Sequence, residues 1–300
     1  MIWVCRIRRY RCCRVWPSPC STPSWGCQLR AWQLAFIVVG LPGILLALLV
    51  TSLREPQRKG LLKARPGDRL NSIPLRQVVA FLGSHRRTYI GNLLGVSLFI
   101  MLSYAILAWT PAFFIRKYGW TAGEIGVAYG TVLLIFGTSG VVSAGWLAEA
   151  LRRRGYTDAN LRLIMFAAMC AMPFAIAAPL VGNAWLALAL MAPMTFFLSL
   201  PHGIGPAALQ PITPNQMRAQ VSALYLLCVS LVGLGIGPTL VALLTDYVYG
   251  KPTLIGYSLA TVAVVAAPLS ILVIGRSLKF YRRSLAAAER GWIGPERVDV

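Results

Sequence analysis

No charged residue interrupts LIMFAAMCAMPFAIAAPLVGNAWLALALMAPMTFFLSLPHGIGPAALQPITPNQM (residues 163–217), a run of 55 positions. At 1.5 Å per residue, one helix of that length would reach roughly 80 Å, whereas the hydrocarbon core of a bilayer is roughly 30 Å thick. The run must therefore fold back on itself. Pro179, Gly182 and Asn183 mark the turn, so we expect two membrane helices, at 163–181 and 184–209.

Further apolar runs stand on both sides of this one. Each is long enough to cross a membrane and contains no charged residue: 33–53, 88–115, 125–148, 219–245 and 252–275. Across the 300 residues, 57% are hydrophobic and 13% are charged, and the mean hydropathy is +0.65. A soluble domain has about a quarter of its residues charged. The sequence predicts an all-α polytopic membrane protein with about seven transmembrane helices.

The basic residues are confined to the loops between these runs. Lys and Arg number 29 against 9 Asp and Glu, for a net charge of +20. A nucleic-acid-binding protein would spread such charge over a folded surface, so we expect no nucleic-acid partner. Basic residues concentrate in segments 54–87, 151–162 and 276–300, while the alternate loops contain only Arg116, Lys117 and Lys251. Because cytoplasmic loops carry the excess, we expect the 54–87 loop and the C-terminus in the cytoplasm.

Residues 1–31 do not fit this pattern. They hold five of the seven cysteines, six arginines and no acidic residue. They lack both the apolar centre of a signal peptide and the Cys-x-x-Cys spacing of a zinc site. An odd number of spans would place this basic segment outside the cell, against the charge rule. We expect an irregular tail that is not native coding sequence.

The loop after the third run has a motif, Gly145-Trp-Leu-Ala-Glu149-Ala-Leu-Arg152-Arg153-Arg154. Glu149 lies one turn before three arginines and can accept charge-assisted hydrogen bonds from them or from a neighbouring helix. Such pairing would latch one conformation, and we expect Gly145 to let two helices approach each other. The alternative interpretation is an ordinary basic cytoplasmic loop with an incidental acid.

Three pairs of glycines are spaced four residues apart: Gly91 and Gly95, Gly126 and Gly130, and Gly233 and Gly237. Small residues at this spacing allow membrane helices to pack closely. Pro238 follows the last pair and removes a backbone donor, so we expect the helix to bend there.

From Trp32 onward the sequence resembles the C-terminal half of the major facilitator superfamily. The resemblance implies that 32–53 is the sixth helix, 54–87 the central cytoplasmic loop, 88–283 a six-helix bundle and 284–300 a cytoplasmic tail. The 145–154 motif is similar to the family's loop motif, although Ala150 stands where a base is expected and Arg152 where a glycine is expected.

Two further segments extend the resemblance. Arg218, Gly233-Leu-Gly235-Ile-Gly237-Pro238 and Asp246 resemble the family's eleventh-helix pattern. The segment from Trp109 to Phe114, followed by Tyr118-Gly119-Trp120, resembles the spinster-like and organic-anion branches.

Polar and aromatic residues inside the spans are the candidates for contacting a solute, since such groups usually face the bundle interior. Those we single out are Tyr104, Trp109, Tyr129, His202, Gln210 and Tyr225. Each could equally face lipid or fill the core, and Trp109 could belong to the interfacial aromatic belt. His202 is the titratable side chain deepest in a span, and the ordinary histidine pKa of about 6.5 suits proton exchange. The alternative for His202 is a neutral ring bonded to nearby backbone.

No enzyme motif is present: the sequence lacks His-Glu-x-x-His and a phosphate-binding loop, so we expect no catalytic residue, metal or cofactor. The resemblance implies secondary active transport of a small organic solute by alternating access across a bacterial inner membrane. Carriers of this kind bind at the midplane between two repeats, and this chain contains one. We therefore expect it to be inactive alone unless a separate N-terminal half or a second copy joins it in the bilayer. The alternative is a non-transporting scaffold or dimerising fragment.

Overall fold

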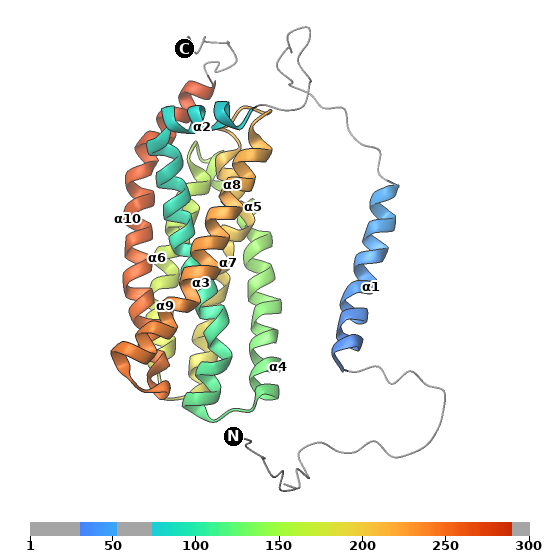
Figure 1. Cartoon of the computed structure of the whole chain (residues 1–300), viewed down its shortest axis with the longest axis vertical. Coiled ribbons are helices and arrows are strands. Elements are labelled where there is room, and N and C mark those ends of the chain that lie inside the picture. Colours follow the sequence, from blue (N-terminus) through green and yellow to red (C-terminus); the bar gives the residue numbers. More distant parts are fainter. Residues whose placement is uncertain (1–30, 53–73, 290–300) are drawn as a thin grey trace, which may run out of the picture. The chain divides into compact units, whose positions relative to one another are not determined.

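The computed structural model describes residues 31–52 and 74–289, and all regular structure in those ranges is helical (Figure 1). The chain divides into two compact units, Met1–Lys59 and Gly60–Val300. The first contains helix α1, Ala31–Thr51, with Pro42 inside it. This helix is 21 residues long and contains no charged side chain. The predicted span at 33–53 is thus helical as far as Thr51, and its crossing of the membrane stays a prediction.

Among its described residues, 74–289, the second unit contains six helices that are long and apolar enough to cross a membrane, which confirms the predicted six-helix bundle. Two of them are interrupted by π-helical turns, and the last begins with a 3-10 turn. The first span is α3, Arg86–Tyr118, and the second consists of α4, Ala122–Val132, η1, Leu133–Gly137, and α5, Thr138–Arg153. The third span is α6, Ala159–Leu180, and the fourth is α7, Ala184–Leu209. The fifth consists of α8, Arg218–Ser230, η2, Leu231–Ile236, α9, Gly237–Leu243, and η3, Leu244–Tyr249, and the sixth of η4, Pro252–Leu254, and α10, Ile255–Glu289.

The long uncharged run turns where the sequence predicts. Helix α6 ends at Leu180 and α7 begins at Ala184. Asn183 caps α7, because its side-chain oxygen accepts hydrogen bonds from the backbone N–H of Trp185 at 2.9 Å and of Leu186 at 3.4 Å. Pro179, by contrast, lies inside the last turn of α6.

The side chain of Lys117, at the end of α3, binds the C-terminal end of α6. The Lys117 ammonium donates to the backbone carbonyls of Pro179 and Val181, each at 2.7 Å. These are carbonyls at the helix terminus that lack a complete set of intrahelical partners. These hydrogen bonds join the ends of α3 and α6 at the end of the bundle opposite α2.

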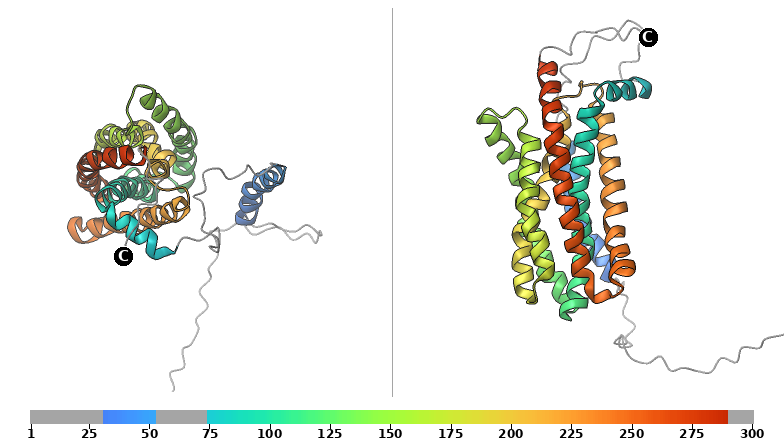
Figure 2. Two further views of the ribbon diagram at one scale, coloured as in Figure 1. Left: turned by 90° about the horizontal axis from the view of Figure 1, so that it is seen from above. Right: turned by 90° about the vertical axis from the view of Figure 1, so that its left-hand side faces the viewer.

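Within the bundle, α10 packs along α3 and α6, and α7 packs along α5 and α6 (Figure 2). Glycines set several of these contacts. A β-carbon at Gly95 would lie 2.5 Å from Cγ1 of Ile274, and one at Gly237 would lie 2.7 Å from the carbonyl oxygen of Met101. Close packing is thus confirmed for the Gly91–Gly95 and Gly233–Gly237 pairs.

Three glycines do not pack as predicted. A β-carbon at Gly126, Gly130 or Gly145 would meet no heavy atom of the described chain within 4 Å. Helices α5 and α7 instead approach at Gly140 and Gly203, where an added β-carbon would lie 2.5 Å and 2.6 Å from a backbone oxygen of the other helix. The glycine of the loop motif is therefore not the contact point between these helices.

Two predicted boundaries also differ. The segment predicted as the 54–87 loop contains an amphipathic helix, α2, Leu75–Ser84, which lies across one end of the bundle (Figure 2). Val78 of α2 is buried and Phe81 packs against the core, while Arg76 and Gln77 are exposed. At the other terminus α10 runs to Glu289, so 284–289 is helix rather than tail. The remaining tail, residues 290–300, and the N-terminal segment 1–30 lie outside the described residues.

Candidate functional site

Two helices, α3 and α7, bring together Ser103, Tyr104 and His202, and α8 places Tyr225 near Tyr104. We call these four side chains the polar cluster. The Nε2 atom of His202 lies 3.4 Å from the Ser103 hydroxyl. The rings of Tyr104 and His202 meet edge to face, with centroids 5.7 Å apart. Tyr104 lies near the middle of its span, so the cluster begins at the centre of α3.

Glycines make room for both tyrosines. The ring of Tyr104 lies against Gly233 in η2, where an added β-carbon would be 2.7 Å from Cδ2 of the tyrosine. The hydroxyl of Tyr225 lies against Gly205 in α7, and Tyr225 is buried. The sequence places a small residue on one helix opposite an aromatic ring on the next, which fixes where each ring lies.

The polar cluster has an open side. Tyr225 is buried and Tyr104 is partly buried, whereas the His202 side chain is exposed in the described unit. Polar side chains within membrane spans usually face a bundle interior or a water-filled cavity rather than lipid. The exposed side of His202 is therefore a face at which a solute, water or further protein can meet the cluster.

The other three residues predicted to contact a solute lie elsewhere. Tyr129 of α4 is buried beside Thr110 and Thr195. Trp109 donates its indole N–H to the carbonyl oxygen of Pro238 at 2.9 Å. Gln210 lies just after α7, away from the cluster. Tyr104, His202 and Tyr225 are thus brought together, while Trp109, Tyr129 and Gln210 are not.

The Trp109 indole binds a carbonyl at a point where the partner helix is irregular. The π-helical turn η2 comes immediately before Gly237 and Pro238, so the regular helical hydrogen bonding changes at this point. The Pro238 carbonyl oxygen accepts a hydrogen bond from the Trp109 indole N–H, and this bond links α9 to α3. On its other side Trp109 faces Arg116, whose guanidinium lies 5.7 Å from the ring centroid.

The charged loop motif pairs only within its own helix in the described residues. Glu149 accepts from Arg152 at 3.4 Å and from Arg153 at 3.3 Å, and all three side chains are exposed. Arg154 is the C-cap of α5. The geometry therefore shows a local ion-pair network, and a latch to another helix stays a prediction.

The two charged ends of the eleventh-helix pattern are far apart. Arg218 begins α8 and donates from Nε to the carbonyls of Gln210 and Thr213, at 3.1 and 3.2 Å, so it closes the α7–α8 connection. Asp246 lies in η3 at the other end of the same span and is exposed. Arg218 and Asp246 therefore do not form one site.

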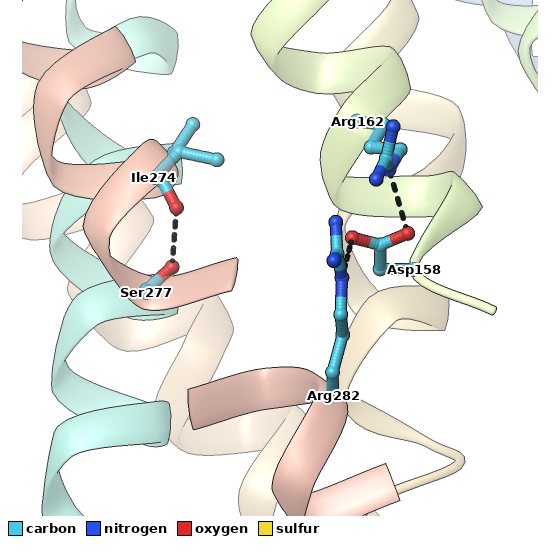
Figure 3. A network of polar contacts seen from close by, with 5 residues as sticks. All are labelled: Asp158, Arg162, Ile274, Ser277 and Arg282. Carbon is cyan, nitrogen blue, oxygen red and sulfur yellow. Dashed lines mark hydrogen bonds and ion pairs between the residues drawn. The ribbon is translucent and has the colours of Figure 1, made fainter. Parts of the chain in front are cut away.

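Sequence reasoning missed an interhelical ion pair at Asp158 (Figure 3). Its carboxylate is 2% exposed and accepts from Nε of Arg162 in α6 and from Nε of Arg282 in α10, each at 2.7 Å. The spacing of Asp158 and Arg162, four residues at a helix start, was a signal available in the sequence. Arg282 was not predictable, because it approaches only through the packing of α6 on α10.

No group of three His, Cys, Asp or Glu side chains gathers among residues 31–52 and 74–289. The arrangement offers hydrogen bonding and aromatic contact at the polar cluster.

The chain is similar to known proteins in both sequence and fold. The sequence profile of the Major Facilitator Superfamily matches residues 22–238. The chain belongs to the major facilitator superfamily. This is a family of membrane transporters, and the six apolar spans agree with an integral membrane protein.

Individual relatives agree with the family. An MFS-type efflux pump of Mycolicibacterium smegmatis is 25% identical over 233 residues, which are 73% of this chain and 49% of that protein. The chain thus spans about half the length of this curated relative. A bacterial homologue of the human lysosomal transporter Spinster, inward-facing and unoccupied, has the same fold at a TM-score of 0.52 and 20% identity, covering 88% of this chain and 60% of the other.

Proposed function

We propose that this chain supplies the C-terminal half of a secondary transporter that moves a small organic solute across a bacterial inner membrane by alternating access. The observation that carries the proposal is the polar cluster, where three helices of an apolar bundle bring Tyr104, His202 and Tyr225 together. Family membership and the efflux pump of M. smegmatis support transport as its general role. The excess of basic residues at the α2 end supports a cytoplasmic C-terminus.

The cluster suits a solute that combines an apolar body with a hydrogen-bonding group. The faces of Tyr104 and Tyr225 supply large apolar contact areas, while the His202 imidazole can donate or accept a hydrogen bond. An imidazole also titrates near neutral pH, so His202 is the proposed site of proton coupling. No acidic side chain lies centrally in a described span, because Glu124, Glu149 and Asp246 stand at span ends.

In this proposal, a second protein segment completes the solute-binding site. His202 is exposed on one side, and midplane sites of such carriers are enclosed between two repeats. A separate N-terminal half, or a second copy of this chain, would supply the opposite wall. We therefore expect the chain alone to bind solute weakly and to transport none.

The experiment is a thermal-shift screen of small organic solutes against the purified full chain in detergent. Solutes that raise the unfolding temperature are then tested on Tyr104→Ala and on Tyr247→Ala. Tyr247 is a matched control because it is an exposed tyrosine at the end of a span. The shift should vanish in Tyr104→Ala and persist in Tyr247→Ala. Equal loss, or no loss, in both variants would remove the polar cluster as the binding site.

Transport is measured separately, in vesicles that contain the chain alone and in vesicles from cells that also express an N-terminal half with the five remaining spans. Uptake that needs the second half, and whose pH dependence disappears in His202→Gln, is the expected result. Uptake by vesicles of the chain alone, with no dimer present, would contradict the requirement for a second element.

The second candidate function is a dimerising membrane scaffold. It is favoured by the face of α4 that carries Gly126 and Gly130, where an added β-carbon meets nothing within 4 Å. Glycines four apart on an open helix face allow a second helix to approach closely. Gly126→Leu with Gly130→Leu should abolish a dimer seen by sedimentation in detergent, whereas Gly235→Leu, also at an open position, should not.

A further inference from the structure

A basic pocket opens at the end of the bundle where α2 ends, α3 begins and the last turns of α10 pass. Its volume is about 340 Å³. The residues that line it include Arg86, Arg87, Thr88, Phe280, Arg283 and Ser284. The polar cluster and the proposed transport path do not involve it.

The pocket is strongly positive and has no acidic lining residue. Arg86, Arg87 and Arg283 all lie on its wall. Two acidic side chains at this end of the bundle are paired with arginines that do not line the pocket. Glu149 pairs with Arg152 and Arg153, and Asp158 pairs with Arg162 and Arg282. Three arginines thus line one small space that has no described acidic residue on its wall.

The pocket also has a fixed wall. The hydroxyls of Thr88 and Ser284 are hydrogen-bonded to each other at 2.8 Å and are buried, which joins α3 to α10 behind the arginines. The guanidinium of Arg87 lies 5.5 Å from the ring centroid of Phe280. This cation–π contact orients Arg87 and leaves its N–H groups available for an anion.

Apolar surface continues from the pocket along the same two helices. Ile90 and Leu94 follow Arg86 at intervals of four residues on α3 and are about half exposed, at 52% and 50%. Leu272 and Leu269, also exposed, lie on α10 eleven and fourteen positions before Arg283, which is a helical repeat of one face. A ligand with a phosphate in the pocket could therefore place hydrocarbon chains along this surface.

We propose that this pocket binds the phosphate group of an anionic phospholipid. Arginine forks match phosphate oxygens through paired charge-assisted hydrogen bonds. The pocket lies at the start of a membrane span, where lipid headgroups are found, and basic pockets at helix ends bind such headgroups. The adjoining apolar face favours a lipid over free phosphate as the source of that group.

The test is native mass spectrometry of the purified full chain in detergent, titrated with phosphatidylglycerol or with phosphatidylcholine. Phosphatidylglycerol should bind more tightly, and Arg87→Gln with Arg283→Gln should weaken it by about fivefold per arginine. The control is Arg153→Gln with Arg154→Gln, which removes the same charge from the same end of the bundle outside the pocket. It should change the affinity by less than about twofold.

Three results would overturn the proposal. They are equal binding of the two lipids, equal loss in the pocket and control variants, and binding of inorganic phosphate at the pocket with no retained phosphatidylglycerol. The last would assign the pocket to a soluble phosphate. If the double glutamine variant does not fold, Arg87→Lys with Arg283→Lys keeps the charge and loses the fork, and should still bind phosphatidylglycerol more weakly than the unmodified chain.

Discussion

Asp158 and Arg282 lie 124 positions apart in the chain, and a 2.7 Å hydrogen bond between them joins the start of α6 to the end of α10 (Figure 3). The same carboxylate also binds Arg162, so its two oxygens each have one guanidinium partner. The Asp158 side chain is 2% exposed, while the side chains of Arg162 and Arg282 are 32% and 48% exposed. The acid is the buried member of the network, and the two bases reach solvent.

We expect Asp158→Asn to lower the free energy of unfolding by about 1–3 kcal/mol. The substitution removes a buried charge that two arginines neutralise, but the arginines keep access to water, so the loss stays below that for a fully buried pair. Unfolding of the purified chain in detergent, followed by circular dichroism, measures the change. Glu149→Gln is the control, because exposed ion pairs contribute at most about 1 kcal/mol. Equal stability of the two variants would show that burial of Asp158 has no energetic effect.

Two glycines in one span provide a test of helix contact. Gly237→Ala should destabilise the bundle by about 1–3 kcal/mol, because its β-carbon would lie 2.7 Å from the carbonyl oxygen of Met101. Gly235→Ala should be neutral or stabilising, since its β-carbon meets nothing within 4 Å and alanine favours helix by about 1 kcal/mol. Thermal unfolding of both variants decides the matter, and similar midpoints would contradict the contact between α3 and α9.

A double-mutant cycle tests the position of Tyr225. Gly205→Ala alone should be strongly destabilising, because its β-carbon would overlap the tyrosine hydroxyl. Tyr225→Phe removes that hydroxyl and should recover part of the loss, giving a coupling energy of about 0.5–3 kcal/mol between the two sites. Purely additive effects would mean that the two residues do not touch.

Trp109→Phe should cost about 1 kcal/mol of stability, because it leaves the Pro238 carbonyl without the indole donor at 2.9 Å. Trp146→Phe is the matched control, since Trp146 is 73% exposed. Thermal unfolding of the two variants gives the comparison. A loss as large in Trp146→Phe would indicate that ring size, rather than the interhelical hydrogen bond, matters.

Local signals allowed the spans and the turn to be predicted. The start of α7 after the turn is capped by the side chain of Asn183, a local signal that can be read from a few neighbouring residues. Helix α2 was missed because the many basic residues of 54–87 indicate a loop. Its inward side chains, Val78 and Phe81, are a short periodic signal within that charge.

The candidate site was predictable only in part, because it depends on which helix faces meet. Polarity inside a span identified Tyr104, His202 and Tyr225, but the same criterion also selected Trp109, which binds a backbone carbonyl instead. The glycine spacing was equally ambiguous. Gly91 and Gly95 contact α10, whereas Gly126 and Gly130 have the same spacing and contact no described residue.

The glycine contacts of α3 have a mechanical consequence. Gly91 and Gly95 hold α3 against α10, and Gly237 holds α9 against Met101 of α3, all at distances that leave no room for a methyl group. Helices in such contact cannot separate or rotate about each other without losing it, so we expect α3, α9 and α10 to keep their mutual positions when the rest of the bundle rearranges.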